Sequence, residues 1–384
     1  MGSLAATFTT MERTEVRPSV PPVVVVPEEA KHAGHRDATV RTLASRIAVL
    51  RGSSVIDYPP ASLPSCGCYA VPVGTLVGSR IASYLGILSE TDLFGGLVPY
   101  AVQAGKAITH SLVEDDAARP EGWSADFARA VRHVTLAGYS AFDRNSAHKA
   151  ATRLLTDGPV RLKAAWADGG QAQRVIRERG ALEPALDALD TPELARCGLV
   201  IEPDLHETRT YSIGRVRIGD AVLAYIGWQH TTPDNAGASA YGGSVLAAVA
   251  GEFDRLRHLP LDEPARQALQ CALTYDEAAS THFPGLIASR RNYDVVSGRD
   301  ATGALRIAVL EQSWRIGGAS GAEIAAFEAF SAAPGLAAVR ASCHERYGRV
   351  HEVPPDSFVY FDADDPEVGP LIKYARIEAR HRAL

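Results

Sequence analysis

Residues 290–315 read RRNYDVVSGRDATGALRIAVLEQSWR, and this stretch decides how the second half of the chain folds. Two largely apolar runs, at 292–296 and 305–312, flank the turn sequence GRDATG. β-Branched runs that are separated by a short segment with glycine are typical of two antiparallel strands. We therefore predict a β-hairpin here.

The predicted hairpin brings two acidic residues together. With the turn centred on 302 and 303, mirror-image pairing across it places Asp294 opposite Glu311. Two facing carboxylates repel each other, so this pairing is unfavourable without a cation. Magnesium prefers oxygen ligands and is usually held by one or two carboxylates together with substrate phosphates. The pair therefore indicates a magnesium-nucleotide site, and an ordinary hairpin with solvated acids is the alternative.

Alternation along the second strand adds a polar group and a cation to this site. Side chains two positions apart share a face of a strand, which places Glu311, Ser313 and Arg315 together. Arg291 precedes the hairpin, and its planar guanidinium is a candidate to clamp an acyl phosphate or a carboxylate. A structural ion pair is the alternative role for Arg291.

A second candidate site lies upstream of the hairpin. The predicted strand 160–163 carries Lys163 and runs into a glycine turn at 168–170, after which 172–179 is predicted to be helical. A strand, a small-residue turn and a helix make a common phosphate-binding unit, because backbone N–H groups can approach the anion closely. The apolar strand 198–202, which ends in Glu202, follows.

The rest of the chain is mixed α and β. We predict a strand at 22–27, helices at 37–51, 262–279 and 321–330, and a hairpin of 210–218 with 221–228 around a Gly-Asp turn. Residues 230–244 are polar and rich in glycine, which indicates a long surface loop that acts as a lid. The C-terminal part is predicted to close the domain irregularly. The expected units are a flexible tail at 1–20, an α/β domain at 21–105, a small subdomain at 106–198 and a large subdomain at 199–384.

Composition excludes several classes of function. The 45 acidic and 39 basic side chains among 384 residues give a net charge of −6, which argues against a nucleic-acid partner. No run approaches the roughly 18 apolar residues of a membrane span, so no membrane association is expected. The five cysteines are scattered and odd in number, which argues against a disulfide framework and favours a reducing cytoplasm.

The order of these segments resembles that of the ATP-grasp superfamily. The lysine strand with its Asp-Gly-Gly-Gln turn, the LVIE strand at 199–202, and the NYD and EQSWR ends of the hairpin follow one another as in an ATP-grasp domain, over roughly residues 106–320. The chain also resembles an uncharacterised proteobacterial family that is placed with ATP-grasp proteins. The resemblance implies an α+β fold with an N-terminal α/β pre-ATP-grasp unit and two α+β subdomains that contain an antiparallel sheet.

The resemblance also implies roles for single residues. ATP would be bound by Lys106, Lys163, Asp168, Gly169, Gly170, Glu202 and Glu207, and magnesium by Asp294, Glu311 and Ser313. Arg291 and Arg315, which are found from their positions at the hairpin, are the candidate catalytic residues. Lys106 is the preferred second phosphate lysine and Lys149 the alternative. Glu202 would lie at the adenine hinge and Glu207 at the ribose. Ser313 departs from the family pattern, which has asparagine there, so a second metal ion is expected to be weakly held or absent.

The expected activity is that of a ligase using ATP and Mg²⁺. The γ-phosphate would move to a substrate carboxylate, and an amine or another nucleophile would attack the acyl phosphate. The expected partners are therefore a small carboxylate and a nucleophile, and a homodimer is allowed for. A small-molecule kinase and a nucleotide-binding regulatory protein without turnover are the alternatives.

Overall fold

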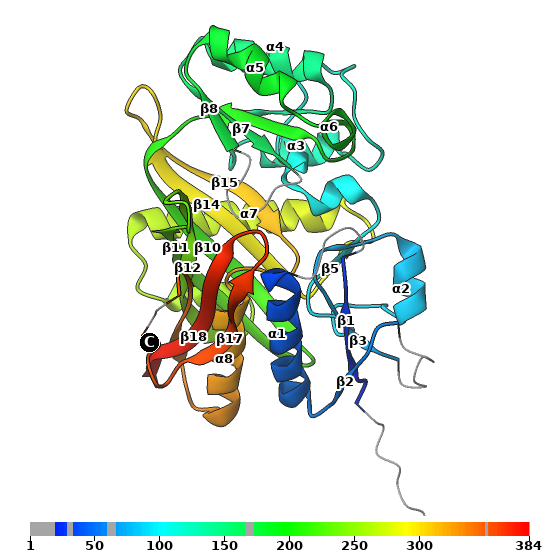
Figure 1. The fold of residues 1–384 in the computed structure, drawn as a ribbon, viewed down its shortest axis with the longest axis vertical. Helices are drawn as coiled ribbons and strands as arrows, with labels where there is room; N and C mark the ends of the chain where they lie inside the picture. Colours follow the sequence, from blue (N-terminus) through cyan, green and yellow to red (C-terminus); the bar gives the residue numbers. More distant parts are fainter. Residues whose placement is uncertain (1–19, 29–33, 60–66, 166–172, 350–351, 384) are drawn as a thin grey trace, which may run out of the picture.

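The computed structural model describes residues 20–28, 34–59, 67–165, 173–349 and 352–383. Four sheets organise the chain (Figure 1). A small lobe at one end carries a four-stranded sheet, and the centre of the molecule is an eight-stranded antiparallel sheet. The first segments of the chain pack beside this large sheet (Figure 1). The fold is therefore α+β, as the sequence predicts.

The N-terminal part forms the three-stranded sheet β2-β1-β3 and two strands of a second one, β13-β5-β4, whose third strand, β13 (Ile287–Ala288), comes from the second half of the chain. The valine run of β1 is buried on both faces, since Val23 and Val25 belong to a core cluster with α1, and Val24 and Val26 belong to another with Leu85 of α2. The elements are β1 (Val23–Val26), α1 (His35–Arg51), β2 (Val55–Ile56), β3 (Tyr69–Pro72), β4 (Leu76–Val77), α2 (Ser79–Leu85), β5 (Gly96–Val98), and the short 3₁₀ turns η1 (Ala101–Ala104) and η2 (Lys106–Ile108).

The small lobe contains the sheet β6-β9-β7-β8, whose strand pairs are antiparallel. Helices α4, α5 and α6 cover the face that carries Leu162 and Ile201, which leaves the face with Lys163 and Val200 toward η2. The elements are α3 (Ala125–Val131), β6 (Tyr139–Ala141), α4 (Arg144–Leu154), β7 (Val160–Ala164), β8 (Gln173–Ile176), η3 (Arg179–Ala181), α5 (Leu182–Asp187), α6 (Thr191–Cys197) and β9 (Leu199–Pro203).

The large sheet has the strand order β15-β14-β10-β11-β12-β16-β18-β17. Helix α7 covers one face of it, and α8 covers the other together with α1. The elements are β10 (His206–Ile218), β11 (Ala221–Pro233), β12 (Ser239–Ala250), η4 (Phe253–His258), α7 (Glu263–His282), β13 (Ile287–Ala288), β14 (Arg290–Arg299), β15 (Leu305–Ser313), α8 (Ser320–Ala332), β16 (Ala338–Tyr347), β17 (Phe358–Asp365) and β18 (Gly369–His381).

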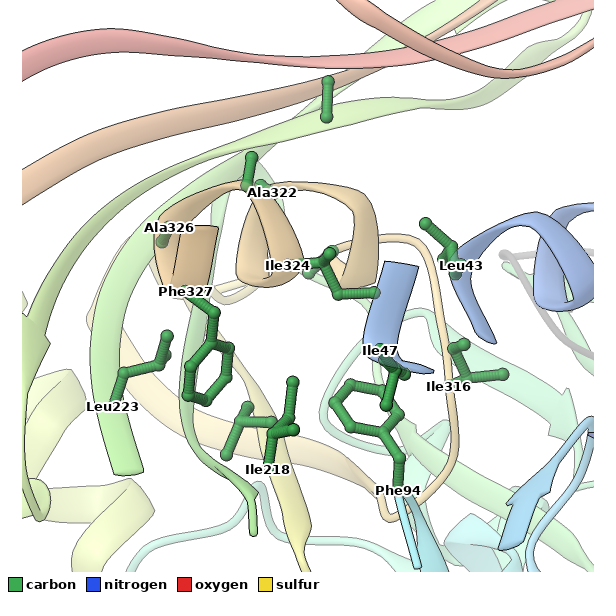
Figure 2. Close-up of a cluster of buried hydrophobic side chains, with 14 of the residues drawn as sticks. Leu43, Ile47, Phe94, Ile218, Leu223, Ile316, Ala322, Ile324, Ala326 and Phe327 are labelled. Atoms are coloured by element: carbon green, nitrogen blue, oxygen red, sulfur yellow. The ribbon is translucent and has the colours of Figure 1, made fainter. Parts of the chain in front are cut away.

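A core of apolar side chains holds α1 and α8 on the sheet. Figure 2 shows Ile47 of α1 and Phe327 of α8 among the side chains of the sheet and of the segment that leads into α8. Phe94 joins this cluster from the N-terminal part of the chain and is fully buried. This core therefore holds the N-terminal segment, α1 and α8 against one face of the large sheet.

The predicted helix at 172–179 is wrong. Residues Gln173–Ile176 form β8, which pairs with β7 from Val160↔Ile176 to Lys163↔Gln173. The backbone groups of β7 need partners on both sides in a central strand, and this pairing decides the conformation of a short segment with little helical periodicity of its own. The glycine turn at 168–170 lies outside the described residues.

The predicted lid at 230–244 is also wrong. Strands β11 and β12 continue through it as a hairpin, and only residues 234–238 connect them. A Cβ atom added to Gly242 would lie 2.9 Å from the carbonyl carbon of Thr231, and one added to Gly243 would lie 2.0 Å from the carbonyl oxygen of Cys343. These glycines therefore allow close strand contact and do not make a loop mobile.

The C-terminal part is more regular than the sequence suggests. Instead of an irregular closure, β16, β17 and β18 extend the large sheet. The prolines at 354 and 355 lie in the connection between β16 and β17, where they interrupt no ladder. These strands pair with partners that are distant in the sequence, so no local pattern predicts the pairing.

Candidate functional site

The predicted carboxylate pair is present on β14 and β15, where Asp294 lies opposite Glu311. The turn itself pairs Arg299 with Leu305 and is centred on residue 302 alone, a register that would set Asp294 opposite Leu310. A β-bulge between Asp294 and Val295 shifts the pairing by one residue. Bulges often re-aim side chains next to functional sites, and here the bulge restores the facing acids.

Asp294 is held by amide donors and is only partly exposed. The Nδ2 atom of Asn292 donates to Asp294 Oδ1 at 3.0 Å, and the side chain of Gln229 donates a second hydrogen bond. Burial and the nearby charge of Glu311 raise the pKa of Asp294 to about 6. Two facing carboxylates suit a cation, which would stabilise both charges.

A buried network lies beneath this acid. Arg290 and Glu323, which are 1% and 0% exposed, form a salt bridge of 2.8 Å between β14 and the first turn of α8. The Tyr225 hydroxyl lies 2.6 Å from Glu323 Oε1 and 2.7 Å from Asn292 Oδ1, which Ser212 Oγ also contacts at 2.7 Å. The donors at Oδ1 turn the amide nitrogen of Asn292 toward Asp294, so the network orients the acid.

Lys106 lies against the other acid. Its Nζ is 2.6 Å from Glu311 Oε2, and its side chain is 8% exposed. Lys106 belongs to η2, which contacts β15. Since β15 is an edge strand of the large sheet, η2 lies beside the edge of that sheet. A cation from the middle of the chain therefore meets a carboxylate from the hairpin, across more than 200 residues of sequence.

A second buried ion pair joins Lys163 of β7 to Glu202 of β9. The two side chains are 5% and 2% exposed, and His110 Nε2 lies 3.4 Å from Glu202 Oε2. Burial by itself raises the pKa of Glu202, but Lys163 and His110 outweigh it and hold this pKa at about 2. The group is therefore a charged carboxylate between two basic side chains on the inner face of the small sheet.

The remaining predicted residues are distributed more widely. Lys149 lies exposed on α4 and pairs with Glu114 at 2.8 Å, on the helical side of the small lobe. Glu207 is largely exposed at the end of β10 and pairs with Arg299 at 3.3 Å. The positions 168, 169 and 170 lie outside the described residues.

The two candidate catalytic arginines, Arg291 and Arg315, have different surroundings. Arg291 points to the α7 face, where Nη1 is 3.2 Å from Asp276 Oδ1 and 2.9 Å from Ser280 Oγ. This is the face opposite to Asp294, so the structure does not bring Arg291 to the carboxylates. Arg315 lies just beyond the end of β15, where its Nη1 donates to the carbonyl oxygen of Ile316 at 3.0 Å, and the hydroxyl of Ser313 accepts a hydrogen bond from Arg290 at 3.3 Å.

Asn292, His110 and Gln312 are neighbours of the predicted residues that the sequence analysis missed. Asn292 and Gln312 lie within the NYD and EQS segments, and alternation alone would have placed Asn292 beside Asp294. His110 carries no local signal, since its partner is 92 positions away in the chain.

The raised pKa of Asp294 predicts how stability depends on pH. Its native pKa of about 6 exceeds the ordinary 3.8, so the native state binds more protons than the unfolded state between these values. Stability therefore falls as pH rises through this window, by on the order of 3 kcal/mol. At pH 7.5 without magnesium, Asp294→Asn is expected to melt about 3–6 °C higher than the wild type. Melting at pH 4 should show no difference, and a gain that persists at pH 4 would contradict this origin.

The described residues limit what metal site is possible. No group of three or more His, Cys, Asp or Glu side chains in this part of the chain could hold a metal ion by itself. Magnesium is ordinarily bound by one or two carboxylates together with phosphate oxygens of a substrate, and a pair of carboxylates matches the protein's share of such a site. No helix within the described ranges combines the length and apolarity that crossing a membrane requires.

A lysine-bearing four-stranded sheet that stands over an antiparallel sheet with paired carboxylates is the ATP-grasp arrangement, and the protein has the ATP-grasp fold. The biotin carboxylase domain of Hydrogenobacter thermophilus 2-oxoglutarate carboxylase, solved with MgADP, ADP and bicarbonate, matches with a TM-score of 0.52 and 13% identity over 93% of this chain and 86% of that one. Phosphoribosylamine–glycine ligase from Thermotoga maritima matches with a TM-score of 0.50 and 11% identity over 94% and 90%.

The chain belongs to the family described as "Protein of unknown function (DUF3182)", whose model matches residues 23–375. No curated protein matches the sequence significantly. At 11–13% identity, the two solved structures establish the fold and leave the activity to the chemistry of the site.

Proposed function

We propose that this protein is a Mg²⁺-ATP-dependent ligase that activates a substrate carboxylate as an acyl phosphate for attack by an amine or another nucleophile. One observation carries the proposal: Lys106 Nζ lies 2.6 Å from Glu311, which faces Asp294 across the hairpin. The ammonium group of Lys106 thus lies beside two facing carboxylates, which supports binding of phosphate oxygens and magnesium at one place. The ligase from Thermotoga maritima has the same fold.

In this proposal the described residues bind and orient the reactants. Asp294 and Glu311 would hold magnesium, which supplies charge neutralisation to the phosphates. Lys106 contacts phosphate oxygens from η2, and Lys163 does so from the small lobe, because three N–H donors allow it to keep Glu202 as a partner. Glu202 lies at the adenine hinge. These groups lower the barrier by positioning and charge stabilisation, and no covalent nucleophile from the protein is needed.

Arg315 is the proposed contact for the substrate. It follows the end of β15, two residues after Ser313, and its guanidinium can pair with a carboxylate through two parallel hydrogen bonds. The γ-phosphate would transfer to one oxygen of this carboxylate with release of ADP. The nucleophile would then attack the acyl carbon, and inorganic phosphate would leave. We do not assign this role to Arg291, which occupies the α7 face.

A nucleotide-binding protein without turnover is the second candidate, and one contact favours it. The hydroxyl of Ser313 accepts a hydrogen bond from Arg290, so it has less capacity for a metal ion than the asparagine of the family pattern. Such a protein would bind Mg²⁺-ATP at the same residues and would release little ADP with any substrate.

A screen of carboxylic acids paired with amines, with ADP and phosphate both measured, tests the proposal. A ligase releases both products only when acid and amine are present together, whereas a kinase releases ADP without phosphate from a single acceptor. Tight Mg²⁺-ATP binding with no ADP release in the whole screen would favour the binding protein. Failure to bind Mg²⁺-ATP at all would contradict all three functions.

A further inference from the structure

Two buried side chains, Gln312 and Tyr275, hold both ends of the turn that carries Lys106. Gln312 Nε2 donates to the carbonyl oxygen of Gly105, the residue before η2, at 2.8 Å. The Tyr275 hydroxyl lies 2.9 Å from Oγ1 of Thr109, the residue after η2. The 3₁₀ turn is therefore held on both sides, at the residue before it and at the residue after it.

The same two side chains also contact each other. Tyr275 donates to Gln312 Oε1 at 3.3 Å, so the Thr109 hydroxyl must donate to Tyr275 for every hydrogen to be used once. A second bond from Gln312 Nε2 reaches the carbonyl oxygen of Gln103 at 3.3 Å. Tyr275 is fully buried and Gln312 is 6% exposed. Buried amides and hydroxyls that are fully satisfied define one geometry, because any other arrangement would leave polar groups unpaired.

We call Gln312 and Tyr275, with their hydrogen bonds to the two sides of η2, the clamp. The position of Gln312 in β15 links this clamp to Glu311. Glu311 and Gln312 are consecutive, so their side chains leave the strand on opposite faces. Glu311 faces Lys106 Nζ, while Gln312 holds the backbone that precedes Lys106. The edge strand thus contacts both the head and the base of the lysine, and it sets the distance between the ammonium group and the carboxylate.

We propose that Gln312, supported by Tyr275, is a positioning residue that holds Lys106 at the phosphate and metal site. Neither side chain touches a reacting group. Their effect on nucleotide binding rests on the proposed function, whereas their effect on Lys106 itself is a property of the protein without nucleotide.

The reactivity of Lys106 toward a small acylating reagent tests the clamp without nucleotide. Gln312→Met keeps the length of the side chain and removes its hydrogen bonds. It is expected to raise the acylation rate of Lys106, followed by mass spectrometry, about fivefold, the factor that one net hydrogen bond supplies. Lys163 is as deeply buried and serves as the internal standard, whose rate should stay constant.

Gln267→Met is the matched control, because Gln267 is exposed on α7 and contacts only Glu263 among the described residues. Tyr275→Phe is the second variant, which keeps the aromatic packing and removes the hydroxyl. An unchanged rate for Lys106 in both clamp variants, or an equal rise for Lys106 and Lys163, would overturn the proposal, since the latter indicates general loosening of the fold.

Calorimetric titration with Mg²⁺-ATP provides the second measurement. Gln312→Met should weaken binding about fivefold in the wild-type background and less than about twofold in a Lys106→Met background, because the clamp acts only through this lysine. Full loss in both backgrounds would mean that Gln312 acts on something else. A wild type that binds no Mg²⁺-ATP would refute the proposed function and leave the clamp to be judged by the acylation rates.

Discussion

Replacement of Glu311 by glutamine is expected to abolish magnesium-dependent ATP turnover and to leave the fold intact. The amide keeps the shape of the side chain and loses the charge that attracts the cation, so ADP release should fall by about 100-fold or more, as when one charge-stabilising group is removed from an active site. The melting temperature should change little. Glu311 is partly exposed, the amide oxygen of glutamine can still accept a hydrogen bond from Lys106, and loss of the charge relieves repulsion of Asp294.

The matched control is Glu263→Gln, at an exposed acid in the first turn of α7 that pairs with Arg266. Both variants should be compared in ADP release across a magnesium titration and in thermal melting. If Glu311→Gln turns over ATP at the wild-type rate, Glu311 does not hold magnesium and the hairpin is an ordinary structural element. A loss of rate that saturating magnesium restores would still identify Glu311 as a ligand.

Substitution of Lys163 is expected to weaken ATP binding far more than substitution of Lys149. Lys163→Gln should reduce affinity about 10- to 100-fold, the range of one hydrogen bond to a charged group. Lys149→Gln should change it by less than about twofold, because that ammonium group lies in solvent beside Glu114, on the helical side of the small lobe. Calorimetric titration of both variants measures the contrast.

Glutamine is preferred to alanine at position 163 for a structural reason. Lys163 neutralises Glu202 inside the small lobe, and removing one partner of a buried pair costs about 3–5 kcal/mol. The amide of glutamine can still donate to Glu202, so the fold is retained while the charge is lost. Equal losses for the two lysines, or a larger loss for Lys149, would place the phosphate lysine on the helix and not on β7.

Much of the fold follows from local pattern. The buried valine run predicts β1, the spacing of Val40, Leu43 and Ile47 predicts α1, and the Gly-Asp turn predicts the β10–β11 hairpin that pairs Ile218 with Ala221. In each case the apolar period and the turn residues lie within about fifteen positions, which is the range over which such patterns act. The elements that were missed, β8 and β16 to β18, depend on partners elsewhere in the chain.

The hairpin of β14 and β15 combines both kinds of information. Its two strands and its facing acids follow from residues 290–315, yet the register assumed for the turn was one residue off. The bulge at Asp294 corrects that difference in the protein. A one-residue change in register moves side chains to the other face of a sheet, so only the three-dimensional structure could establish which residues share the face.

The sequence by itself determined the lysine strand and the two strands of the hairpin, because these depend on short-range periodicity and turn chemistry, and its resemblance to ATP-grasp proteins indicated the fold class. The opposition of Asp294 to Glu311 was predicted from an assumed register and depends on the bulge that the tertiary structure supplies. Only the tertiary structure decided that Lys106 reaches Glu311, that His110 joins Lys163 at Glu202, and that Arg291 lies on the opposite face. These contacts join segments that are tens to hundreds of residues apart, and packing of the whole chain, not any local preference, brings them together.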